Sequence, residues 1–168
     1  GCTVPPPPAL PATAGAAPSP ARPTSTMAPP TPSPSPTAPA CLSRPGQVLI
    51  DEVMAEGMGR SLPYRVYLPP CFEAGQAKGY PVLVLIHGLQ STDSQWDDLG
   101  VNEAADELIQ DGRLAPMVIV MPWERKGLDF EAAIVDVLLP HIRQRYAGDG
   151  DRATTAIGGL ARGAGWAL

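Results

Sequence analysis

A five-residue segment near the end of the chain, Gly159-Leu160-Ala161-Arg162-Gly163, has the spacing of a turn that presents a nucleophile. With serine at its centre it would be Gly-x-Ser-x-Gly, a sharp strand-to-helix turn that exposes a reactive hydroxyl. Such a hydroxyl can attack a carbonyl carbon and form an acyl intermediate. Ala161 has no oxygen. The segment therefore predicts a nucleophile turn without its nucleophile, and an ordinary glycine-rich turn is the alternative.

Two backbone N–H groups would complete the chemistry of this turn, because acyl transfer needs donors for its developing oxyanion. One donor is the N–H that follows the nucleophile position, which here belongs to Arg162. The other lies in a loop after an earlier strand, where Leu89 follows His87-Gly88. Both donors are backbone groups, so both survive the alanine. We expect His87 to shape this loop.

The rest of a catalytic triad is not found in the chain. In this arrangement the order is Ser, then Asp or Glu, then His, whereas His87 and His141 both precede Ala161. Neither fits the catalytic base, and His141 is predicted to be structural or to face solvent. The acid and the base are expected beyond Leu168.

Other polar clusters give weaker signals. Asp97-Asp98 and the pair Asp149 and Asp151 lack the additional ligands of a metal site, so no metal is expected. Asp149-Gly150-Asp151 is more typical of a turn. Trp123 opens a polar segment, residues 123–126, that follows an apolar strand, at the edge where α/β sheets bind ligands. We expect Trp123, with His87 and Gly88, to contact substrate; a polar surface loop is the alternative for this segment.

The elements that must position these residues can be predicted from the apolar pattern. Two strands, Gln47–Glu56 and Leu62–Leu68, form a hairpin around a turn at Gly57–Gly59. Apolar runs without alternation indicate strands that are buried on both faces. The remaining elements are strands Pro81–His87, Met117–Met121 and Ala153–Ile157, and helices Asn102–Gln110 and Asp129–Tyr146, the second kinked at Pro140.

This order predicts an α/β fold. Alternating strands and helices indicate a doubly wound parallel sheet, preceded by an antiparallel N-terminal hairpin. The last strand would be an open edge. We therefore expect an incomplete doubly wound sheet that is poorly stable alone, unless a complementing chain or a dimer covers that edge.

The sequence resembles the esterase D-like α/β-hydrolases, the "putative esterase" group that includes enterochelin, feruloyl and acetylxylan esterases and mycolyltransferases. Only the N-terminal half of such a domain is matched. The matching segments are RVYLPP (65–70), YPVLVLIHG (80–88), WDDLG (96–100), ADELI (105–109), PMVIVMP (116–122), LLPHI (138–142) and AIGGLARGAGWAL (156–168). The resemblance implies a carboxylic ester hydrolase that acts through a seryl acyl-enzyme without a cofactor.

Residues 1–45 differ in composition from residues 46–168, which we predict to be the esterase domain. From Val4 to Pro45 the chain is almost entirely Pro, Ala, Thr and Ser. Such a segment has too little apolar surface to fold, so we expect a disordered, Pro-rich linker with a reach on the order of 100 Å. A ragged terminus without a role is the alternative for this segment. Gly1-Cys2 resembles a processed lipoprotein N-terminus, with lipid on Cys2.

If Cys2 carries lipid, Cys41 and Cys71 remain as a pair. An even remainder in an exported protein favours a disulfide, which would contribute about 3 kcal/mol by closing its loop. Two unpaired thiols are the alternative. The predicted location is the bacterial envelope, lipid-anchored or periplasmic to extracellular.

The composition argues against nucleic acid as a partner. Two functions stay open, a carboxylic ester hydrolase and a non-catalytic binding protein. The net charge is -5, and no basic patch with interleaved aromatic residues predicts nucleic-acid binding. The chain as written is expected to be inactive, with an ester of unknown identity as substrate of the parent enzyme. Three explanations fit Ala161 and the abrupt end: a partial gene product, a substitution made to trap ligand, and a natural non-catalytic, envelope-anchored binding protein.

Overall fold

The computed structural model describes residues 39–55, 59–73, 79–147 and 152–167. By internal contacts the chain divides into Gly1–Pro36 and Thr37–Leu168. The first unit, with Cys2, lies outside the described residues, as do the predicted turns at Gly57 and at 149–151. Among the described residues, no helix has the length and apolar character needed to cross a membrane.

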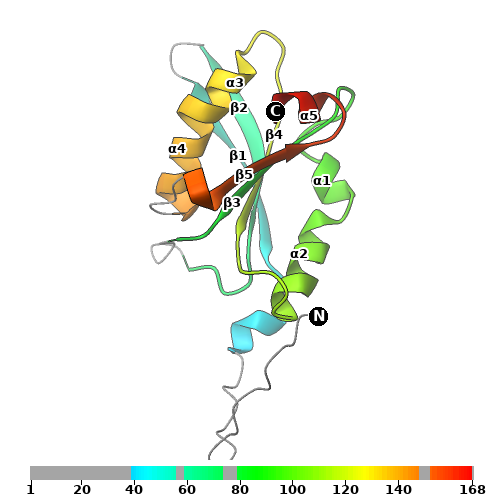
Figure 1. The fold of residues 1–168 in the computed structure, drawn as a ribbon. Helices are drawn as coiled ribbons and strands as arrows, with labels where there is room; N and C mark the ends of the chain where they lie inside the picture. The colour runs from blue at the N-terminus through cyan, green and yellow to red at the C-terminus, as the bar shows by residue number, and fades with distance from the viewer. Residues whose placement is uncertain (1–38, 56–58, 74–78, 148–151, 168) are drawn as a thin grey trace, which may run out of the picture. The chain divides into compact units, whose positions relative to one another are not determined.

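The centre of the second unit is a five-stranded mixed sheet in the order β1-β2-β4-β3-β5 (Figure 1). Its strands are β1 (Gln47–Ala55), β2 (Arg60–Leu68), β3 (Val82–Ile86), β4 (Val118–Pro122) and β5 (Thr155–Gly159). β1 pairs antiparallel with β2 and β2 antiparallel with β4. β3 runs parallel to both β4 and β5. The predicted hairpin, followed by parallel strands, is confirmed.

Helices cover both faces of the sheet (Figure 1). α1 (Gln95–Asp98) and α2 (Val101–Gln110) lie on one side, and a long helical segment from Phe130 to Ala147 lies on the other. Successive strand residues point to opposite faces, so Val84 and Val120 join the core beneath the long helix, whereas Leu85 and Ile119 join the core beneath α2. This two-sided burial explains the unbroken apolar runs of β3 and β4.

The long helical segment differs from the prediction in its hydrogen bonding. It consists of α3 (Phe130–Ala132), the π-helix η2 (Ala133–Leu138), α4 (Leu139–Ile142) and the π-helix η3 (Arg143–Ala147). Pro140 was expected to kink the helix; the chain stays helical through α4, and wider π-helical turns lie on both sides of it. A proline removes one backbone donor, and the altered hydrogen-bonding register accommodates that loss.

A short helix precedes the domain boundary that the sequence predicts at residue 45. The 3₁₀-helix η1 (Ala40–Ser43) belongs to a stretch that we expected to be disordered linker. A disulfide joins Cys41 to Cys71, with their Cα atoms 5.1 Å apart. The predicted pairing is thus present, and it ties η1 to the residues that follow β2. This cross-link therefore anchors residues that precede the domain boundary predicted at residue 45.

Candidate active site

Ala161 lies at the junction between β5 and α5 (Arg162–Trp166), with an exposed side chain. Its backbone has φ 52° and ψ −111°, a conformation outside the regions that L-residues normally occupy. Three backbone hydrogen bonds hold the turn: Leu160 N–H donates to Ile86 O at 3.2 Å, Gly163 N–H to Leu160 O at 2.9 Å, and Ala164 N–H to Ala161 O at 3.1 Å. The strain is therefore maintained by the surroundings of Ala161, because a methyl group makes no polar contact.

Two glycines make this turn sterically possible. A Cβ at Gly163 would overlap the carbonyl oxygen of Ile86 and lie 2.6 Å from that of His87. A Cβ at Gly159 would overlap the carbonyl group of Gly163. The glycines at the first and last positions of the segment thus allow α5 to pack directly on the end of β3.

Replacing Ala161 with glycine should stabilise the protein by about 1 kcal/mol. Positive-φ strain on an L-residue costs about 1–3 kcal/mol, and the greater freedom of glycine in the unfolded chain offsets about 0.4–1 kcal/mol of the gain. Urea unfolding measures the difference. The matched control is Ala164→Gly within α5, which should lose about 0.5–1 kcal/mol; equal losses at both positions would contradict strain at Ala161.

The loop after β3 lies directly against this turn. A Cβ built on Gly88 would be 4.0 Å from the Cβ of Ala161 and 3.6 Å from the carbonyl oxygen of Leu160. The Gly88 N–H donates to Gln95 Oε1 at 2.7 Å, which fixes the loop to α1. Among the described residues, the N–H groups of Leu89 and Arg162 form no backbone hydrogen bond. These two N–H groups are therefore available as donors close to Ala161.

His87 links this loop to the segment that follows β4. Its side chain is buried, and its Nδ1 lies 2.7 Å from the carbonyl oxygen of Gly88. Its Nε2 accepts the Glu124 N–H at 2.9 Å. Since a carbonyl can only accept, Nδ1 carries the proton and the imidazole is neutral. His87 therefore shapes the loop, as the sequence suggests, by bridging two loops at the same edge of the sheet.

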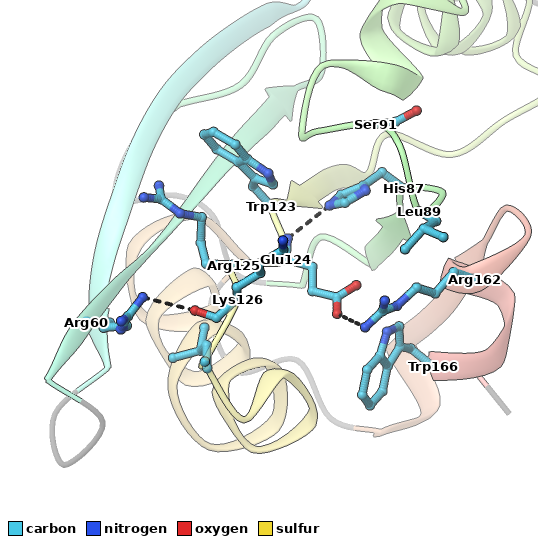
Figure 2. A pocket seen from close by; sticks show the side chains of 12 residues that line it. Arg60, His87, Leu89, Ser91, Trp123, Glu124, Arg125, Lys126, Arg162 and Trp166 are labelled. Carbon is cyan, nitrogen blue, oxygen red and sulfur yellow. Dashed lines mark hydrogen bonds and ion pairs between the residues drawn. The ribbon is translucent and has the colours of Figure 1, made fainter.

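A cavity of about 720 Å³ opens beside the turn (Figure 2). The predicted residues His87, Leu89, Trp123 and Arg162 line it, whereas Gly88 and Ala161 do not. The other lining residues are Arg60, Ser91, Glu124, Arg125, Lys126, Gly127, Leu128 and Trp166. Segment 123–126, for which the sequence left two interpretations, thus forms one wall of the cavity.

Two features of the cavity were not predicted. Arg162 Nη2 pairs with Glu124 Oε1 at 2.5 Å, across 38 positions of sequence. The Trp166 ring packs edge-on against Phe130, with centroids 5.8 Å apart. No local pattern could reveal these contacts, because they depend on which loops meet at the sheet edge. The carboxylate at the end of β4 was the available signal for the first.

The remaining polar candidates lie outside the cavity lining. His141 Nε2 lies 3.0 Å from the Tyr64 hydroxyl, and burial raises the pKa of Tyr64. Asp97 accepts from Arg65 Nη1 at 2.7 Å, so the Asp97-Asp98 pair has an ionic partner. No cluster of three metal-ligating side chains occurs within the described ranges.

Comparison with known proteins supports an esterase lineage. Residues 55–133 match the family described as "Putative esterase". An endo-1,4-beta-xylanase/feruloyl esterase from Xylanibacter ruminicola is 28% identical over 125 residues, which cover 65% of this chain and 17% of that protein. Among solved structures, a ferulic acid esterase is 31% identical, with a TM-score of 0.66. The match covers 73% of this chain and 51% of the esterase chain.

A second solved structure has the same fold at lower identity. A ferulic acid esterase from Anaeromyces mucronatus, in complex with ferulic acid, is 23% identical with a TM-score of 0.65, covering 74% of this chain and 52% of that one. The chain therefore spans about half the length of the solved structures it matches. The match of residues 55–133 to the putative esterase family and the likeness to these relatives are consistent with a partial esterase-family domain that has the α/β-hydrolase fold.

Proposed function

We propose that the chain carries the nucleophile corner and the oxyanion loop of a carboxylic ester hydrolase. One observation carries the proposal: Ala161 occupies a strained strand-to-helix corner that faces Gly88. A sharp turn of this kind presents the nucleophile in α/β-hydrolases. The family match and the fold of the relatives support the same reading.

In this proposal residue 161 is the nucleophile position and catalysis is acyl transfer to water. A serine hydroxyl there would attack the ester carbonyl, while the N–H groups of Leu89 and Arg162 stabilise the oxyanion. The alcohol would leave, and water would release the acid from the acyl-enzyme. Ala161 has no oxygen for the attack. The chain as written is therefore proposed to be inactive.

The first substrates to test are esters of hydroxycinnamic acids. The relatives bear the names feruloyl esterase and ferulic acid esterase, and the cavity includes the aromatic rings of Trp123 and Trp166. The location that we propose is outside the cytoplasm, because disulfides such as Cys41–Cys71 persist in oxidising compartments. Lipid on Cys2 and a complementing chain or dimer beside β5 remain parts of this proposal.

A second candidate is a non-catalytic, envelope-anchored protein that binds esters or their products. Ala161 favours this candidate, because it removes the nucleophile and leaves the backbone donors and the cavity in place. A serine-to-alanine mutant of the feruloyl esterase module from Clostridium thermocellum is complexed with sinapinate. That structure motivates a search for ligand binding without turnover.

Restoring the hydroxyl decides between the two candidates. Ala161→Ser would be expressed with any coding sequence that follows Leu168 and assayed with p-nitrophenyl acetate and methyl ferulate. Loss of a triad nucleophile costs up to about 10⁶-fold in rate, so we expect the serine variant to exceed the parent by at least about 10³-fold.

The control for this assay is Gly165→Ser, which adds a hydroxyl in open space on the same helix. A folded Ala161→Ser protein no faster than this control would defeat the hydrolase proposal and favour the binding protein.

A further inference from the structure

Positive charge is concentrated in the cavity beside the corner. Arg60, Arg125, Lys126 and Arg162 line it, and these are four of the twelve Lys and Arg residues of the chain. Among the described residues, Glu124 is the one carboxylate in the lining. The lining therefore carries a net charge of four minus one, or +3, in a protein whose net charge is -5. A basic cavity in an acidic protein attracts anionic ligands selectively.

Among the residues that the structure describes, the cations at one end of the cavity have no carboxylate partner. Glu124 pairs with Arg162, whose guanidinium is thereby partly neutralised. Arg60 Nη1 donates to the carbonyl oxygen of Lys126 at 2.9 Å, and the Arg125 guanidinium lies 4.7 Å from the centroid of the Trp123 ring. Within the described parts of the chain, Arg60, Arg125 and Lys126 form no ion pair.

Within the described ranges, the cations without an ion-pair partner lie at the end of the cavity that is distant from the corner at Ala161. Arg60, Arg125 and Lys126 are linked to one another by contact and sequence, and Figure 2 shows Arg162 and Trp166 on the opposite side of Glu124. Arg162 immediately follows the corner residue Ala161. A ligand that reaches the corner with its reactive group would therefore extend its other end toward the unpaired cations. The Trp123 ring also lines the cavity, with the Arg125 guanidinium over one of its faces.

We propose that this cavity selects a ring compound, aromatic or sugar, whose end distant from the corner carries a carboxylate. The ring packs on Trp123, and the carboxylate pairs with the cations of Arg60, Arg125 and Lys126, as charge-assisted hydrogen bonds favour. The orientation rests on the proposed function, since it places the reacting group at Ala161. Binding of the anion itself does not require hydrolysis, so it can be tested on the alanine protein.

The test is a titration of the full chain, followed by calorimetry, with four probes. These are 4-hydroxyphenylacetate, its neutral amide, digalacturonate, and the neutral dimethyl ester of digalacturonate. At least one carboxylate probe should bind about tenfold or more tightly than its neutral counterpart, and the difference should shrink as salt screens the charges. The aromatic and sugar arms identify which ring the site takes.

A double variant and a matched control locate the site. Arg125→Gln with Lys126→Gln should weaken binding of the carboxylate by at least about tenfold. Arg113→Gln with Arg152→Gln removes the same charge at exposed positions that do not line the cavity, and should leave affinity unchanged. Three results would overturn the proposal: charged and neutral probes bind equally, no probe binds, or the two double variants lose affinity equally. An inactive Ala161→Ser protein that still selects the carboxylate would refute the hydrolase alone.

Discussion

Gly163→Ala is expected to destabilise the protein by about 3 kcal/mol or more, and to do so through a single methyl group. The new Cβ would overlap the Ile86 carbonyl oxygen and lie 2.6 Å from that of His87. Both obstacles are backbone atoms at the end of a central strand, so no side-chain rotation relieves them. Overpacking in a rigid core already costs about 1–3 kcal/mol, and here α5 must move away from the sheet.

Urea unfolding followed by circular dichroism measures this loss, and Gly165→Ala is the matched control. A Cβ at Gly165 meets no atom within 4 Å, and alanine is favoured over glycine in a helix by about 1 kcal/mol. The control should therefore gain slightly where Gly163→Ala loses heavily. Similar midpoints for both variants would show that α5 does not need to pack against β3.

Removing the disulfide has the second large expected effect. The bridge between Cys41 and Cys71 closes a loop with a sequence separation of 30, and the chain-entropy model gives about 3–4 kcal/mol for a loop of this length. The double variant Cys41→Ser with Cys71→Ser should lose this stability, and η1 should lose its attachment to the end of β2. Urea unfolding with and without dithiothreitol provides the measurement.

The third cysteine supplies the control for that experiment. Cys2→Ser removes a cysteine that has no part in the bridge, so this variant should unfold at the parental midpoint. Reduction should lower the midpoint of the parent and of Cys2→Ser alike, and should leave the double variant unchanged. A double variant as stable as the parent would mean that the linkage constrains nothing in the unfolded chain.

Much of the fold could be predicted because its elements have periods that burial enforces. β3 and β4 are apolar throughout because helices cover both faces, and β2 is followed by Pro69-Pro70, which cannot extend a ladder. The helical turn of α1 was missed, since four residues are too few to establish a period. The π-helical segments around Pro140 were missed because they depend on hydrogen-bond register.

The candidate site also contains features that the sequence predicts and features that depend on tertiary structure. The corner at Ala161 was predictable because glycine spacing reports a local steric requirement. The cavity was only partly predictable: Trp123 and His87 follow strands whose ends meet at one edge, whereas the pairing of Glu124 with Arg162 is a product of tertiary structure. Arg60 reaches the cavity from the antiparallel hairpin, far from the parallel strand ends that guide such predictions.

The corner at Ala161 keeps its shape through glycines and backbone hydrogen bonds in which the side chain at 161 takes no part. Exchange of the side chain at position 161 is therefore expected to leave the shape of the corner intact. Alanine codons (GCN) become serine codons (UCN) by one nucleotide change, whereas rebuilding the surrounding backbone would require many coordinated changes. A gene that encodes this alanine is therefore one nucleotide change away from a serine on a corner that is already built.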